Sequence, residues 1–140
     1  MANAKYNAGK LGILSGAINL TSGTIKCLLV TSGYTPDIVA HQFLSDITNQ
    51  VANGNGYTTG GQTVTGKTFT RNDTTNVAVF AAANAVWPAS TITASGSVIY
   101  LDTGNPATST LISFHDFGGN VTSTNGAFTV PLSNEIIELN

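Results

Sequence analysis

Clusters of glycine and asparagine punctuate the chain after Asn49, and this texture favours strands and turns over long helices. Turn-forming residues cluster at positions 53–56 (Asn-Gly-Asn-Gly), 60–61 (Gly-Gly) and 71–76 (Arg-Asn-Asp-Thr-Thr-Asn). Between these clusters β-branched residues predominate, and such residues favour strands. The pattern therefore predicts many short strands joined by tight turns.

Six strands are expected by this reasoning, near residues 62–71, 76–83, 91–101, 110–117, 126–132 and 134–139. Short strands at near-regular spacing are typical of an antiparallel β-sandwich or barrel. The alternation of helix and strand that a nucleotide-binding parallel sheet needs is not visible. We therefore expect a mainly β fold with one or two short α-helices in the N-terminal third. The length of 140 residues favours a single domain over residues 1–140.

The segment 24–31 has apolar residues on both faces of a potential strand. Ile25, Cys27 and Leu29 fall on one side, and Leu28 and Val30 fall on the other. Strands that are apolar on both faces are buried on both faces. This segment is therefore predicted to be a central strand.

A short amphipathic helix is predicted over residues 36–48. The run Thr-Pro-Asp at residues 35–37 offers a capping residue, a proline at the first helical position and an acid in the first turn. Val39, Phe43 and Ile47 follow at a spacing of four, which places them on one helical face. If this face packs on the sheet, Phe43 belongs to the core.

Residues 1–20 are ambiguous between a helix and an arm. Apolar residues recur at helical spacing, but Gly9, Gly12 and Gly16 each weaken a helix by about 1 kcal/mol. We leave two alternatives open here: a helix that completes the core, or an arm that orders on binding a partner. The candidate partner-binding anchors in this segment are Tyr6, Leu11, Ile13 and Leu14.

The chain is poor in charge, with 9% charged residues and a net charge of −2. Its basic residues are scattered at Lys5, Lys10, Lys26, Lys67 and Arg71, so no patch exists to displace phosphate counterions, and nucleic-acid binding is not expected. No apolar run approaches the roughly 20 residues of a membrane span, and no membrane partner is expected. The N-terminal residues lack the apolar core of a signal peptide, so synthesis in a cytoplasm is expected.

Groups that could hold a metal or run catalysis are few. A single cysteine, Cys27, forms no internal disulfide, and no Cys/His cluster has metal-ligand spacing, so we expect no metal and no cofactor. Ser113 and His115 fall on one face of the strand near 110–117, whereas Asp116 falls on the other, which separates a base from its orienting carboxylate. We therefore expect no enzyme activity; a small hydrolase that uses His115 is the least favoured reading.

Several other polar positions have ordinary structural explanations. His41 is expected at the surface of the 36–48 helix, and residues 102–105 (Asp-Thr-Gly-Asn) are expected to form a tight turn. The glycine-rich residues 53–61 precede a strand-like run, so they are expected to form a loop and not a phosphate site. The aromatic and large aliphatic residues expected in the core are Tyr57, Phe69, Phe80, Trp87, Ile92, Val98, Tyr100, Phe114, Phe117 and Phe128.

Motifs without any catalytic signature follow one another in an ordered series along the chain. They are Thr-Ile-Lys-Cys-Leu-Leu-Val-Thr-Ser-Gly-Tyr-Thr-Pro at 24–36, the Asp/His/Phe-containing stretch 37–46, Gly-Tyr-Thr-Thr-Gly-Gly at 56–61, Trp-Pro-Ala-Ser-Thr-Ile-Thr at 87–93, the run 98–112, Asp-Phe-Gly at 116–118 and Ser-Thr-Asn-Gly-Ala-Phe-Thr at 123–129. This series resembles a family of small virion proteins encoded in the structural-gene region of tailed bacteriophages. Relatives tend to carry more acids where this chain has residues 81–86.

The resemblance implies a capsid decoration, or cement, protein that binds the outer surface of an assembled head and stabilises it. The implied partner is the major capsid protein, with self-association as a homo-oligomer a further expectation, and the implied location is the capsid exterior of a virion. A tail or fibre-tip module that binds a host receptor is the alternative, because neutral β-rich domains suit that task equally well. Neutral, β-rich surfaces pack against protein with little charge to desolvate.

Overall fold

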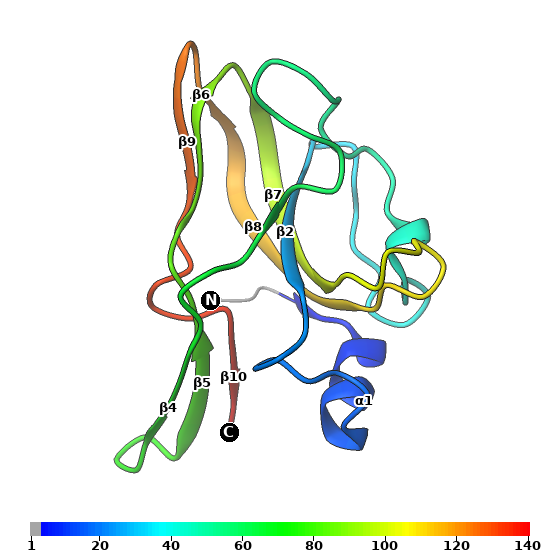
Figure 1. Ribbon diagram of the computed structural model, residues 1–140, viewed down its shortest axis with the longest axis vertical. Coiled ribbons are helices and arrows are strands. Elements are labelled where there is room, and N and C mark those ends of the chain that lie inside the picture. Colours follow the sequence, from blue (N-terminus) through cyan, green and yellow to red (C-terminus); the bar gives the residue numbers. More distant parts are fainter. Residues whose placement is uncertain (1–3) are drawn as a thin grey trace.

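Three antiparallel sheets and one α-helix make up the computed structural model, which describes residues 4–140 (Figure 1). The order of elements is β1 (Ala4–Lys5), α1 (Asn7–Ser15), β2 (Ile25–Val30), the 3₁₀ turn η1 (Leu44–Asp46), β3 (Gln62–Thr63), β4 (Thr68–Asn72), β5 (Val77–Ala81), β6 (Ala85–Ser90), β7 (Thr93–Leu101), β8 (Leu111–Thr122), β9 (Gly126–Val130) and β10 (Ile137–Leu139). The sheets have the orders β1-β8-β7-β2-β3, β10-β5-β4 and β6-β9. The expected mainly β, antiparallel, sandwich-like fold is confirmed.

The strand β2 lies inside the main sheet and is buried on both faces. It pairs with β7 from Ile25 opposite Leu101 to Val30 opposite Gly96, and with the short β3 on its other side. Its side chains divide between two apolar clusters, as the alternation of a strand requires. The predicted central strand is confirmed.

The two apolar clusters lie on opposite faces of the main sheet. One joins the inner sides of Ile25 and Ile99 to Trp87 and Phe128 of the small β6-β9 sheet, and it continues to Phe80 of β5. The other joins residues of β2, β7 and β8 to Tyr6 of the N-terminal segment and Tyr34 of the loop after β2. Its buried members are Tyr6, Leu28, Val30, Tyr34, Val98, Tyr100, Leu111 and Phe114. Figure 1 shows β6 and β9 on one side of the main sheet, and the loops before β3 and before β8 on the other.

The helix predicted over residues 36–48 is wrong: within this stretch only η1 is helical. The Asp37 carboxylate does accept hydrogen bonds from the N–H groups of Val39 and Ala40, at 3.0 and 2.9 Å, as a helix cap would. The turn then stops, because Phe43 adopts an extended conformation and forms an isolated bridge with Thr110. A tertiary backbone pairing overrides the local helical pattern.

The predicted strands agree with the structure except around residues 62–71 and 85–90 and at the end of β8, which continues to Thr122, beyond the predicted range 110–117. The first is broken between β3 and β4, where Gly66 has a φ of 61°. The second, β6, was not predicted because it contains Pro88. Proline is tolerated there since β6 pairs only with β9, with a bulge between Trp87 and Ser90.

One of the predicted core residues lies at the surface. Phe69 is 48% exposed, because β4 forms the edge of the three-stranded sheet and nothing covers the outer part of its ring. Phe117 is half-buried. The other expected core residues are buried: Tyr57, Phe80, Trp87, Ile92, Val98, Tyr100, Phe114 and Phe128. Phe43 is only partly buried, so it is not a core residue.

Candidate functional site

The helix α1 lies directly on the main sheet at Gly9, which has no side chain. A Cβ on Gly9 would stand 2.5 Å from the Leu111 carbonyl oxygen and 2.8 Å from the Ile112 Cα, both in β8. A Cβ on Gly12 would stand 2.6 Å from Ile18 Cδ1. Two of the glycines that weaken the helix in the sequence therefore make close contacts, Gly9 with β8 and Gly12 with Ile18 of the following segment, whereas Gly16 ends the helix with a φ of 80°. Of the two alternatives for this segment, residues 7–15 adopt the packed helix.

Tyr6, which the sequence predicts as a partner-binding anchor, is a core residue in the structure. Its side chain is fully buried, and its hydroxyl lies 2.7 Å from the hydroxyl of Tyr34. Its N–H donates to the carbonyl of Ile112 at 3.0 Å, which fixes the start of α1 on β8. Burial raises the pKa of Tyr6 far above its usual range, and the contact with Tyr34 adds to this. Tyr6 therefore serves the core and offers no surface to a partner.

The other predicted anchors divide between the core and the outer face of α1. Ile13 is half-buried and packs against the larger apolar cluster. Leu11 and Leu14 point outward, with 67% and 82% of their surface exposed. Val39, in the loop beside the helix, is 68% exposed as well. Three large aliphatic side chains thus lie exposed, and two of them, Leu11 and Val39, line the same groove.

A shallow groove runs between α1 and the loop that follows Tyr34; we call it the α1 groove. Its volume is about 520 Å³. The residues that line it are Asn7, Ala8, Leu11, Gly12, Ser15, Ala17, Ile18, Val39, Gln42, Phe43 and Thr110, and none of these carries a charge. The N–H of Asn7 donates to the carbonyl of Ile38 at 3.0 Å, which ties the loop to the start of the helix.

Two carboxylates hold the loop wall of the α1 groove in shape. Asp37 accepts from the N–H groups of Ala40 and Val39, and Asp46 Oδ2 accepts from those of Phe43 and Gln42, at 3.0 and 2.8 Å. These backbone donors lower the pKa of both carboxyl groups below the ordinary value. The groups act on the backbone of their own loop, so they are structural here.

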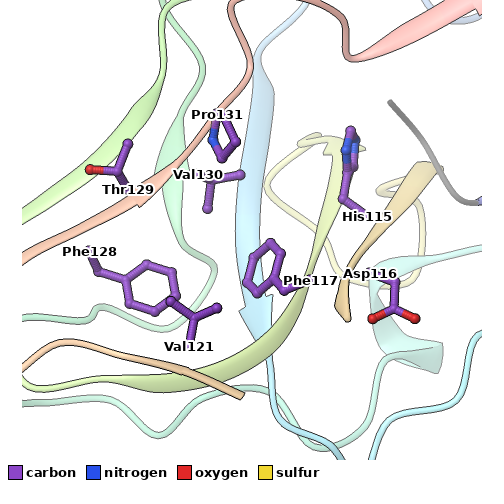
Figure 2. Close-up of a pocket in the computed structure, with 8 residues that line it drawn as sticks. All are labelled: His115, Asp116, Phe117, Val121, Phe128, Thr129, Val130 and Pro131. Atoms are coloured by element: carbon purple, nitrogen blue, oxygen red, sulfur yellow. The ribbon is translucent and has the colours of Figure 1, made fainter. Parts of the chain in front are cut away.

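A second hollow, of about 250 Å³, lies between β8 and β9 (Figure 2). Figure 2 shows the side chains of Phe117, Val121, Phe128 and Val130 gathered around its middle, while the polar ends of Thr129 and Asp116 point away. Phe117 and Phe128 approach to a centroid distance of 6.1 Å. The remaining lining residues are His115 and Pro131. This hollow is apolar and holds no arrangement of acid, base and nucleophile.

Ser113 and His115 lie together on one face of β8, as the alternation predicts. Ser113 Oγ is 3.3 Å from His115 Nε2, and both side chains are buried, Ser113 completely. A nucleophile has to reach its substrate, and a buried Ser113 hydroxyl offers no such access. The pair is a hydrogen-bonded contact inside the sheet.

The other candidate positions have structural roles. His41 Nδ1 lies 3.0 Å from the hydroxyl of Tyr34 and also accepts from the N–H of Asp37. Asp102 closes a tight turn by accepting from the N–H of Gly104 at 2.9 Å, and it pairs with Lys26 at 3.2 Å; these contacts lower its pKa.

The single cysteine, Cys27, is buried. Burial raises the pKa of Cys27 to about 12, so its reactive thiolate form is suppressed at neutral pH. Within residues 4–140 no group of three or more His, Cys, Asp or Glu side chains is placed to hold a metal ion. Over the same residues, no helix is long and apolar enough to cross a membrane.

Val39 lines the α1 groove, which the sequence pattern did not predict. The helical spacing assigned it to a buried face, together with Phe43 and Ile47. The feature that accounts for its exposure is the turn at Asp37, whose carboxylate accepts from the N–H of Val39 and leaves the Val39 side chain at the surface.

Comparison of the chain with family models, with curated proteins and with solved structures gives no match.

Proposed function

We propose that the protein is a virion structural protein of a tailed bacteriophage that decorates the outside of the assembled head and stabilises it. The order of the sequence motifs suggests this class. The observation that carries the proposal is the exposure of Leu11 and Leu14 on α1 and of Val39 in the neighbouring loop, with Leu11 and Val39 lining an uncharged groove. The partner proposed for this face is the major capsid protein.

The chemistry of the α1 face suits a permanent attachment to a protein lattice. Burying a large aliphatic side chain contributes about 1.5–3 kcal/mol, and no charge in the groove lining has to lose its water. The helix is already packed on β8, so little chain entropy is lost when the partner binds. A rigid apolar ridge of this kind fills a depression between capsid subunits.

Copy number and position on the particle test the proposal. Particles of the phage that encodes the chain are purified, separated into heads and tails, and resolved on a protein gel with band densitometry. A decoration protein is expected in the head fraction in a number comparable to the capsomers. A few copies in the tail fraction would instead support the receptor-binding alternative, and absence from both fractions would overturn a virion role.

A further inference from the structure

The edge strand β4 presents an aromatic side chain to solvent at the rim of the three-stranded sheet. β4 pairs with β5 alone, and all of its residues are exposed. Phe69 stacks on Phe80 at a centroid distance of 5.0 Å, yet it remains 48% exposed. Figure 1 shows the β4–β5 hairpin projecting away from the main sheet, with β4 on the outer side. A regular edge strand without proline or a bulge is a template for another strand.

The hydrogen bonds of the neighbouring strand reveal which groups of β4 face outward. The carbonyl of Phe80 accepts from the N–H of Ile136 at 2.7 Å, so the polar backbone groups of Phe80 point toward the β10 side. Phe69 lies opposite Phe80 in the ladder, and the two residues of such a pair direct their backbone groups away from each other. Phe69 and, by alternation, Arg71 therefore each direct an N–H and a C=O to the free edge.

We propose that β4 pairs antiparallel with β4 of a second copy of this chain, about a twofold axis that passes through Thr70. The two three-stranded sheets then join into one six-stranded sheet. Phe69 of each copy exchanges backbone hydrogen bonds with Arg71 of the other, which satisfies the groups that face the edge. Such an interface is isologous, the commonest kind in homo-oligomers.

The charges of β4 select this register over its neighbours. With the axis at Thr70, Phe69 faces Arg71 of the second copy, and no two like charges face each other. With the axis at Phe69, Arg71 would face Lys67, and with the axis at Arg71 the two arginines would face each other. Like charges directly opposite across strands are destabilising.

The pairing also covers the exposed ring. Residues opposite each other in a ladder have their side chains on the same face, so the Arg71 guanidinium of the second copy lies beside the Phe69 ring. Arg over an aromatic ring is an attractive contact. Within the described part of the single chain, Arg71 pairs with Asp73 at 3.3 Å. Both side chains are highly exposed, so the pair has little energetic weight and the guanidinium can reorient.

The assembly closes at two copies because the opposite edge of the sheet is occupied. β10 forms that edge, and the carbonyl of Glu138 there accepts a hydrogen bond from Lys5 Nζ at 2.6 Å. This contact from Lys5 of β1 engages a backbone carbonyl of β10 and places a charged side chain against that edge, and charge at a sheet edge discourages further strand pairing. The dimer therefore does not extend into a filament.

Single cysteine substitutions test the register directly. Thr70→Cys places two thiols opposite each other across the axis, where Cα atoms stand about 4.5 Å apart, within disulfide range. Thr68→Cys is the matched control, because its copies would stand about 13 Å apart, four residues along the ladder. Native Cys27 is buried and does not compete. Under mild oxidation we expect the Thr70→Cys protein to form a linked dimer about tenfold or more faster than the Thr68→Cys protein. Equal rates would overturn the proposal.

A second pair of variants tests the backbone bonds. Arg71→Pro removes an N–H that faces the free edge, so the monomer is expected to keep its fold by circular dichroism. Arg71→Ala removes the same side chain but keeps this N–H. In the Thr70→Cys background, we expect Arg71→Pro to slow linking to the control rate and Arg71→Ala to link faster than Arg71→Pro. Equal linking by these two folded variants would contradict strand pairing.

Discussion

At the scale of single residues, a glycine of α1 is unfavourable for helix formation but allows the helix to pack on the sheet. Gly9 weakens an isolated helix, and helix propensity alone assigns a gain of about 1 kcal/mol to an alanine there. In the fold, the Cβ of an alanine would stand 2.5 Å from the carbonyl oxygen of Leu111, and backbone cannot move aside cheaply. We therefore expect Gly9→Ala to lower the free energy of unfolding by about 1–3 kcal/mol, measured by chemical denaturation. An increase in stability would contradict the packing of α1 on β8.

Two aspartates of the groove loop make stability depend on acid. The pKa values of Asp37 and Asp46 are lowered in the folded protein, so the unfolded chain takes up protons first as the pH falls. Their contribution is complete above the unfolded pKa, near 3.8, and is lost as the pH falls through the folded values. The melting temperature is therefore expected to fall below about pH 4.

The double variant Asp37→Asn, Asp46→Asn isolates this effect. An amide oxygen still accepts the backbone hydrogen bonds but does not titrate in this range. We expect its melting temperature to fall less than that of the unchanged protein between neutral pH and about pH 3. The acid end of this range lies below the ordinary pKa of aspartate. Parallel acid profiles would show that the loop carboxylates do not contribute.

At the scale of elements, the alternation of apolar residues predicted most strands, whereas the helical spacing over residues 36–48 predicted a helix that does not form. The strand β2 could be predicted because burial on both faces leaves a run of apolar residues that needs no partner to recognise. The loop after Tyr34 could not, because the bridge of Phe43 with Thr110 joins residues far apart in the sequence. Strand β6 was hidden for a related reason, since its Pro88 is acceptable only at an edge.

The energetic weight of Phe43 tests this correction. Had residues 36–48 formed a packed helix, Phe43→Ala would cost about 3–5 kcal/mol. Because Phe43 is only partly buried, we expect a loss of about 1–2 kcal/mol, consistent with partial burial of its apolar surface. Phe128, which is 2% exposed, is the comparison, and Phe128→Ala is expected to cost about 3–5 kcal/mol. Equal losses from the two variants would place Phe43 in the core after all.

At the scale of the whole molecule, the candidate site could be predicted only in part. The low charge and the apolar residues of the N-terminal segment are visible in the sequence, and Leu11 and Leu14 are indeed exposed. The sequence does not separate them from Tyr6, because which side of the helix faces the sheet depends on the contact of Gly9 with β8. The exposure of Phe69 depends in the same way on the position of β4 within its sheet.

The proposed attachment to a capsid through the exposed residues of α1 predicts a particular response to salt. The groove lining carries no charge, and salt screens apolar contacts far less than exposed ion pairs. The most direct test measures co-sedimentation of the protein with capsids that lack it, at about 0.1 M and about 1 M salt, where the screening length falls from roughly 10 to 3 Å. The variants are Leu11→Gln with Leu14→Gln, and the control is Lys10→Gln on the same helix.

We expect the double leucine variant to fold normally and to bind capsids at least about tenfold more weakly, because two aliphatic contacts are lost. The unchanged protein and the Lys10→Gln control are expected to bind alike at both salt concentrations. Undiminished binding by the double leucine variant, or a collapse of binding by the unchanged protein at high salt, would contradict attachment through the α1 face.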